Sequence, residues 1–536
     1  MSVATLKPAG SASRAGAPAH PLAAFDPYAH RYLIALTVTL ASIMELLDTS
    51  IVNVAIPHMM GNLGATLDQI AWVSTGYIVA NVIVLPITGW LSAYFGRRRY
   101  FAGSIMLFTV ASFFCGNAHS LGSLVAWRIV QGLGGGALLS TSQAVLYEVF
   151  PPAEYGVAMA IFGVGVMVGP TLGPTLGGWI TDTYSWPWIF YINIPFGMIA
   201  LLLTLAYLRD SRFAEKAERV DALGLLLLAL GIGTLQTMLE RGESQDWWAS
   251  REIVAYALVS AVSLTTFVWH ELRTEHPVVD LRILKSLQFS AGVLFGGALG
   301  LCLYATVFVL PVYLQSVLGF TANQTGMVIL PGALASAFTM AATSRARGRM
   351  DGRILVIAGV AVFMAAMWQM SHFTTQSGGR DFFWPLVLRG VGLGLVFVPL
   401  TNLALADLPM SRIPNGTGLF NLMRQLGGSI GIALAATVFP RLLSQNRAVL
   451  IEHVTRFNDA TQHRLAGLTG TLIARGVAPG EAPARALAIL NGEVSRQAMM
   501  LTFDRLFILF GWSFVIALPL LLLMRKGRGF TGGGAH

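Results

Sequence analysis

Two carboxylates stand inside a long apolar stretch near the start of the chain. Glu45 and Asp48 interrupt a run that is otherwise apolar from Tyr32 to Pro57. Residues three apart share one face of a helix, and two neighbouring carboxylates in a low dielectric cannot both ionise cheaply. A charge at the centre of a membrane span costs about 2.5–3.5 kcal/mol, so the pair predicts a site that takes up and releases a proton. We expect Asp48 to exchange the proton and Glu45 to tune or share it. The spacing does not fix Asn53 to the same face.

A structural role for these carboxylates is the alternative. A buried carboxylate can also be held permanently by an arginine or by nearby hydroxyl groups, without any proton exchange. Arginines stand inside other apolar segments, at Arg128, Arg389 and Arg424. The sequence therefore predicts a charged site within the membrane and leaves open whether it is functional or structural.

The composition is that of a polytopic membrane protein. The chain has 536 residues, of which 55% are hydrophobic and 11% are charged, and its mean hydropathy is +0.65. A soluble protein carries about 25% charged residues. The net charge of +9 is explained by basic cytoplasmic loops rather than by nucleic-acid binding. Cys115 and Cys302 both lie in apolar runs, so we expect inert buried thiols and no metal cluster.

Fourteen apolar segments are long enough to span a bilayer as helices, whereas barrel strands need only about ten alternating residues. We expect an all-α fold with spans at residues 32–56, 70–92, 100–117, 121–147, 155–181, 188–208, 221–239, 253–270, 289–314, 324–344, 353–371, 382–406, 416–439 and 504–524.

Basic residues predict the orientation in the membrane. They concentrate in loops that an even span count places on one side, and such loops are cytoplasmic. Both termini are then cytoplasmic, with residues 1–30 and 525–536 as tails, the first of them disordered. The loop residues concerned are Arg97, Arg98, Arg99, Arg209, Arg212, Lys216, Arg219, Arg345, Arg347, Arg349 and Arg353.

One long loop, residues 440–503, falls on the outer side. It is polar but has apolar residues at helical spacing, and Gly476–Pro483 interrupts it. We expect an amphipathic helical hairpin outside the membrane. It is either a solvated extension of the last two spans, or a docking surface or lid.

Weak internal sequence repeats suggest that the two halves of the chain arose by duplication. The basic loop at 89–99 has a counterpart at 345–353, and a glycine-rich stretch at 127–136 has one at 388–397. We therefore expect two six-helix halves, at 31–208 and 289–524, with an inserted helix pair at 209–288. Duplicated halves around a midplane site are the architecture of many secondary transporters.

Several motifs together resemble the major facilitator superfamily, and more narrowly its fourteen-helix EmrB/QacA-type drug:proton antiporters. The resemblance covers nearly the whole chain and implies a proton-driven exporter with no cofactor besides the coupling proton. The motifs are LDTSIVNVAIP at 47–57, the loop at 89–98, Arg128, Gln131 and Gly132, GVGVMVGPTLGPTLGGW at 163–179, WPWIFYINIPFG at 186–197 and NLMRQLGGSIG at 421–431.

The segment 221–242 and the tail 532–536 resemble the EmrB branch in particular. That branch implies a bacterial inner-membrane pump of a tripartite system, with an EmrA-type periplasmic adaptor and a TolC-type outer-membrane channel. A stand-alone exporter of the QacA kind is the alternative within transport, and a membrane sensor or scaffold is the alternative from another class. The chain has no Walker loop, HExxH, CxxC or GxSxG motif, so we do not expect an enzyme.

The resemblance also implies roles for single residues. Arg128 matches a position thought to help proton transfer, by pairing alternately with Asp48 and with backbone carbonyl groups. The alternative is a fixed structural ion pair. Arg389 and Arg424 are its counterparts in the second half, and together with Asn53 they are candidate substrate or gating residues. Arg424 either meets an anionic substrate or ties helices together. The cytoplasmic gate loop comprises Gly89, Gly96, Arg97 and Arg98. Ala93 stands where the superfamily usually has an acidic residue, so the charge pair of that loop is missing or rebuilt.

The antiporter motif places small residues and prolines at short spacing. In the functional interpretation these residues form a pliable hinge against the opposite half, and in the structural interpretation they only allow close packing of helices. They are Gly165, Gly169, Pro170, Gly173 and Gly177. Residues 289–344 contain no Asp or Glu. This absence, beside the two arginines of the second half, favours hydrophobic substrates that are neutral or weakly acidic.

Overall fold

The computed structural model describes residues 30–211, 220–345 and 350–524. The predictions for the two tails, and for the basic residues at 212–219 and 346–349, fall largely or wholly outside these ranges. Seventeen α-helices and five short 3-10 helices make up this part of the chain, which contains no β-strand. The prediction of an all-α fold is confirmed.

The helices have the following bounds: α1 Arg31–Leu63, α2 Leu67–Ile70, α3 Trp72–Phe95, α4 Arg97–Gly116, α5 Leu121–Val149, α6 Tyr155–Thr183, α7 Trp188–Tyr191, α8 Asn193–Tyr207, α9 Ala222–Arg241, α10 Arg251–Arg273, α11 Leu287–Ser316, α12 Ala322–Arg345, α13 Gly352–Met370, α14 Gly379–Leu405, α15 Ile413–His453, α16 Asp459–Ala474 and α17 Ala482–Ile516. The 3-10 helices are Pro152–Glu154, Trp247–Ala249, Leu281–Lys285, Met410–Arg412 and Leu518–Leu523.

Thirteen segments of the described chain are long and apolar enough to cross a membrane. The fourteenth expected span, α5, is absent from this set although it has 29 residues. Its lower hydropathy follows from its composition, because Gln131, Gln143 and a run of small residues replace aliphatic side chains. Those small and polar residues face neighbouring helices, since most of α5 beyond Gln131 is buried.

The helices pack as two groups with a pair between them. In the first group α1 packs on α6, and α5 packs on α3 and α4; in the second, α11 packs on α15, and α14 packs on α12 and α13. The groups meet through α6 against α12 and through α3 against α15. Helices α9 and α10 pack on each other, and α9 also contacts α3 and α15. This arrangement agrees with two halves and an inserted pair, while the exact domain boundaries stay a prediction.

Polar contacts hold several helix ends together at one end of the bundle. Arg31 at the start of α1 pairs with Glu154 just before α6, with nitrogen and oxygen 3.1 Å apart. Arg97 at the start of α4 pairs with Glu148 near the end of α5 and donates to the Arg209 carbonyl oxygen after α8. These helix ends therefore lie on the same side of the bundle, as an alternating up-and-down topology requires.

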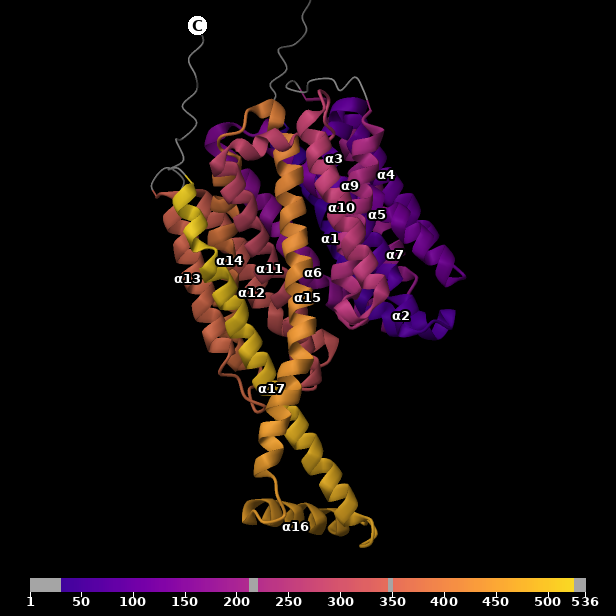
Figure 1. Cartoon of the computed structure of the whole chain (residues 1–536), viewed down its shortest axis with the longest axis vertical. Helices are drawn as coiled ribbons and strands as arrows, with labels where there is room; N and C mark the ends of the chain where they lie inside the picture. Colours follow the sequence, from indigo (N-terminus) through magenta and orange to yellow (C-terminus); the bar gives the residue numbers. More distant parts are fainter. Residues whose placement is uncertain (1–29, 212–219, 346–349, 525–536) are drawn as a thin grey trace, which may run out of the picture.

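The opposite end carries the predicted hairpin. Helices α15 and α17 continue well beyond the bundle, and α16 lies across their tips (Figure 1). The break predicted at Gly476–Pro483 is present, because α16 ends at Ala474, Gly476 has a φ of +89°, and α17 begins at Ala482. The loop is thus an extension of the last two spans capped by one transverse helix.

Candidate proton and substrate site

Asp48 lies at the centre of a buried polar network. Its Oδ2 accepts a hydrogen bond from Arg128 Nη1 at 2.5 Å, and its Oδ1 accepts from Gln131 Nε2 and Asn193 Nδ2, each at 2.9 Å. Ser112 Oγ accepts from the same two amides at 2.6 and 3.3 Å. All five side chains are buried. Helices α1, α4, α5 and α8 each contribute to this network.

Arg128 is as fully engaged as its partner. Its Nε donates to the Val73 carbonyl oxygen at 3.0 Å, and its Nη1 also donates to Gln131 at 2.7 Å. The guanidinium lies 4.1 Å from the ring centroid of Tyr77, close enough for a cation–π interaction. The sequence predicted that Asp48 and Arg128 belong together, and the geometry brings them together as a saturated ion pair.

Glu45 has a different environment, although it lies less than one turn before Asp48. Its Oε1 accepts a hydrogen bond from Asn81 Nδ2 of α3 at 3.0 Å. Its Oε2 is buried and has no hydrogen-bond partner among the described residues. A carboxyl group with one buried oxygen free has a position at which it can carry a proton without breaking another contact.

Arg424 of α15 is a buried cation from the other half of the molecule. None of its three guanidinium nitrogens has a hydrogen-bond partner in the described structure, and the side chain is fully buried. The charged carbon lies 5.5 Å from the ring centroid of Phe397. Glu45 and Tyr304 are the groups that interact electrostatically with it. Arg424 and Glu45 thus interact electrostatically across the two halves, without an ion-pair contact between them in the described structure.

Arg389 of α14 is likewise buried without partners for its Nε and Nη1. It lines a small pocket with residues of α6, α11 and α12. The sequence analysis grouped Arg389 with Arg424 as substrate or gating residues. The structure places both in the interior, but on different helices and in different surroundings.

The gate loop is held by a rebuilt set of polar contacts. Arg97 pairs with Glu148 of α5, which stands in place of the acidic partner that Ala93 does not supply. The backbone nitrogen of Arg98 donates to Asp210 Oδ1 at 2.9 Å. Gly96 has a φ of +85°, which favours glycine. The described residues thus hold the start of α4 by a charge pair that does not involve position 93.

Gly89 supplies a close contact between the halves. A Cβ atom at this position would overlap the Asn415 side chain of α15. Other contacts across the halves lie at the same end of the bundle: Tyr147 donates to Asn402 Oδ1 at 2.9 Å, and Asn421 Nδ2 donates to Gln143 Oε1 at 2.8 Å. The gate-loop end is therefore closed by direct polar contacts between the halves.

The antiporter-motif glycines face a different neighbour from the one expected. Cβ atoms at Gly165, Gly169, Gly173 and Gly177 would each meet α1, which belongs to the same half. These residues recur every four positions and so share one helix face. Pro170 lies on an adjacent face and lines a pocket with α11 and α12 of the opposite half. Only the proline of this set contacts the opposite half as predicted.

Asn53 lies apart from the charged residues. It is exposed, and its Oδ1 accepts a hydrogen bond from Ser74 Oγ of α3 at 3.2 Å. The structure thus gives Asn53 no contact with Glu45, Asp48 or Arg128.

Sequence reasoning missed the neutral partners of the carboxylates. Gln131, Asn193 and Asn81 are all buried amides that donate to Asp48 or Glu45. Gln131 and Asn193 lie within motifs that the sequence analysis quoted, so their presence in apolar segments was a readable signal. Asn81 and Ser112 carried no such signal.

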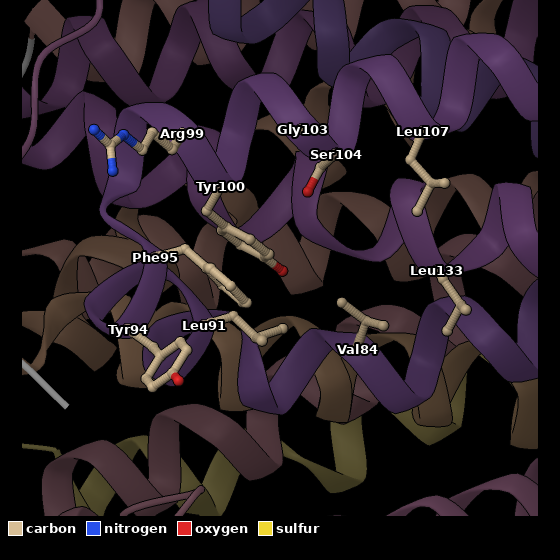
Figure 2. Close-up of a pocket in the computed structure, with 10 residues that line it drawn as sticks. All are labelled: Val84, Leu91, Tyr94, Phe95, Arg99, Tyr100, Gly103, Ser104, Leu107 and Leu133. Carbon is tan, nitrogen blue, oxygen red and sulfur yellow. The ribbon is translucent and has the colours of Figure 1, made fainter. Parts of the chain in front are cut away.

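A second hollow of about 550 Å³ opens on the surface between α3, α4 and α5 (Figure 2). It is lined mainly by apolar side chains, with Tyr100 near its middle and Arg99 at one end. None of the predicted functional residues lines it. The hollow is therefore separate from the charged site.

Comparison with known proteins places the chain among transporters. The family model described as Major Facilitator Superfamily matches residues 38–432. Multidrug export protein EmrB of Escherichia coli K12 is 34% identical to this chain over 509 residues. The matched region covers 94% of this chain and 98% of the EmrB sequence. Fatty acid resistance protein FarB of Neisseria gonorrhoeae is 34% identical over 504 residues, which cover 94% of this chain and 97% of the FarB sequence.

A solved structure is similar in fold. The human organic anion transporter MFSD10 (TETRAN) superposes with a TM-score of 0.56 at 14% identity, over 90% of this chain and 99% of its own. At this identity the likeness concerns the fold alone.

Proposed function

The chain belongs to the Major Facilitator Superfamily as an EmrB-type member, and from this membership we propose that it exports hydrophobic compounds, neutral or weakly acidic, in exchange for protons. The observation that carries the proposal is the pair formed by Glu45 and Arg424. A carboxylate with a free oxygen and a cation without a hydrogen-bond partner in the described structure lie on opposite halves of the molecule and interact electrostatically. Intramembrane charges are costly, so such an unsatisfied pair points to function.

The proton is exchanged at Glu45 in this proposal. The sequence pattern favoured Asp48, but all hydrogen-bonding contacts of Asp48 are to fixed groups, including the ion pair with Arg128. Glu45 has only Asn81 as a donor. The Asp48–Arg128 pair then acts as a positioning element, which fixes α1 against α4, α5 and α8 next to the exchanging group.

Arg424 meets the substrate. An uncompensated guanidinium in an apolar interior attracts an anionic or strongly polar group. A weakly acidic amphiphile would satisfy it through its carboxylate, while the aromatic surroundings, including Phe397, would accept the apolar part. Arrival of a proton on Glu45 changes the field at Arg424, and this change links proton uptake to substrate release.

The relatives support this substrate class. One is named a multidrug export protein and another a fatty acid resistance protein. A fatty acid is a weak acid with an apolar chain, and so suits a buried cation that lies beside the Phe397 ring. We extend both kinds of substrate to this chain as a proposal.

The chain is a multi-pass membrane protein, and we place it in the bacterial inner membrane with both termini in the cytoplasm. It then serves as the inner-membrane part of a tripartite pump with an EmrA-type adaptor and a TolC-type channel. The extension formed by α15, α16 and α17 points away from the basic loops and is the natural part to reach toward such partners. A stand-alone QacA-like exporter would need no contact there.

The test uses purified protein in proteoliposomes with an imposed pH gradient. Efflux of a lipophilic weak acid is compared for the wild type, Glu45→Gln and Asp48→Asn. We expect gradient-driven efflux in the wild type and its loss in Glu45→Gln, with substrate binding retained. Efflux in the wild type that ignores the gradient would overturn proton coupling. Full gradient-driven efflux in Glu45→Gln would remove Glu45 from the mechanism.

A further inference from the structure

A small pocket lies where the two halves meet, on the side of the bundle toward α16. Its wall is formed by α6, α11, α12 and the Arg389 side chain of α14. Thr325 lies in the first turn of α12, at the end of that helix remote from the gate loop. The pocket therefore lies between the two halves, on the side of the bundle remote from the gate loop.

Unpartnered polar groups converge around this pocket. Arg389 is only 6% exposed, and its Nε and Nη1 have no hydrogen-bond partner. The Thr325 hydroxyl, which also lines the pocket, is buried without a partner. Across from it, the unpartnered Thr175 hydroxyl of α6 packs against Gly326. Buried polar groups are almost always hydrogen-bonded in native proteins, so this group of three calls for a ligand.

The chemistry of that ligand follows from the donors. Arg389 offers only N–H donors in a planar arrangement, which match a carboxylate. Hydroxyl groups add donors that can rotate to meet the same oxygens. The rest of the wall is apolar and includes Pro170, Pro174 and Ile329. An anionic head group attached to an apolar chain satisfies both parts of the wall.

We propose that Arg389, Thr325 and Thr175 form a carboxylate-binding subsite for amphiphilic acids on their way out, separate from Arg424. The cavity volume is about 20 Å³, enough for about one water molecule. A carboxylate is larger than this space, so it enters only when the contact between α6 and α12 widens during the transport cycle. The inference rests on the proposed export of weak acids.

The location also couples the subsite to the hinge. Pro170 and Pro174 of the antiporter motif belong to the first half, whereas Thr325 and Arg389 belong to the second. A carboxylate held between them bridges the halves at the exit side. Its departure removes that bridge and favours separation of α6 from α12.

The test measures equilibrium binding of tritiated octanoate to the purified full-length protein, with octanoate and 1-octanol as competitors. It is done in the Arg424→Gln background, which removes the other buried cation. We expect residual binding that octanoate displaces and octanol does not. Adding Arg389→Gln weakens it by about 10–100-fold, as for loss of charged hydrogen bonds, and Arg389→Lys restores part of it.

Two results would overturn the subsite. One is the absence of octanoate-specific binding in Arg424→Gln itself, and the other is unchanged binding after Arg389→Gln. Gradient-driven transport of a neutral substrate is measured in parallel with the same proteins. If the wild type shows no gradient-driven transport of the neutral substrate, proton-driven export is wrong. If this transport persists in Arg389→Gln while octanoate binding is lost, the result supports the subsite independently of the proposed export.

Discussion

Arg128 Nη1 lies 2.5 Å from Asp48 Oδ2, and both side chains are buried. Within the same turn of α1, Glu45 keeps one carboxylate oxygen without a partner. Two carboxylates that lie three residues apart on one helix thus have opposite environments. Asp48 accepts hydrogen bonds from donors of α5 and α8. Glu45 keeps a free oxygen and interacts electrostatically with Arg424 of the opposite half.

The saturated pair predicts a stability effect. Breaking a buried ion pair by removing one partner costs about 3–5 kcal/mol, because the remaining charge is uncompensated. We expect Asp48→Asn and Arg128→Gln each to lower the unfolding temperature of the purified protein in detergent. The double variant Asp48→Asn/Arg128→Gln should recover part of the loss. Single variants as stable as the wild type would show that the pair is not structural.

Arg424 predicts the reverse behaviour. Among the described residues its guanidinium has no hydrogen-bond partner at bonding distance, although Tyr304 interacts with it electrostatically. Arg424→Gln therefore removes a desolvated charge and should leave the unfolding temperature equal to the wild type or higher. Transport of a weak acid should fall by about tenfold or more, while transport of a neutral substrate changes much less. Efflux assays in proteoliposomes check this.

Arg128→Gln is the matched control for this prediction, since it also removes a buried arginine but one with a full set of partners. It should destabilise the protein and reduce the transport of both substrates. If Arg424→Gln behaves in the same way, Arg424 ties helices together and does not meet the substrate.

The gate loop depends on the ion pair between Arg97 and Glu148. This pair joins the start of α4 to the end of α5 near the contacts that close that end of the bundle. We expect Arg97→Ala to reduce gradient-driven efflux several-fold through loss of this closure. The exchange Arg97→Glu/Glu148→Arg should restore part of the activity, because it keeps opposite charges at the two positions.

Arg99→Ala serves as the control for that experiment. Arg99 is exposed and forms no ion pair with the described residues, although it follows Arg97 by two positions. Its removal should leave efflux close to that of the wild type. Equal losses in Arg97→Ala and Arg99→Ala would indicate that general positive charge, rather than the pair with Glu148, supports the gate.

The sequence predicted the architecture well because its signals are local. Run length and hydropathy locate each span, and the break at Gly476–Pro483 follows from glycine and proline. The pairing of Asp48 with Arg128 was also expected, since two isolated opposite charges in a membrane must be compensated.

The remainder of the site depends on how the helices are rotated against each other. Asn81 reaches Glu45 from α3, and Ser112 reaches the Asp48 network from α4. Neither residue is unusual in its own segment, so no local pattern marks it. For the same reason the spacing of Gly165 and Gly173 showed that they share a face but not that the face lies on α1.

That glycine face gives a final prediction. A Cβ atom at Gly173 would overlap the Ser50 hydroxyl of α1, and enlarging a well-packed contact typically costs about 1–3 kcal/mol. We expect Gly173→Ala to lower the unfolding temperature and the efflux rate, and Ser50→Gly in the same chain to relieve part of both. Gly61→Ala is the control, since nothing lies within 4 Å of a Cβ there and alanine favours a helix by up to about 1 kcal/mol. If Gly173→Ala is as stable and active as Gly61→Ala, close approach of α1 and α6 does not determine the fold or the transport cycle.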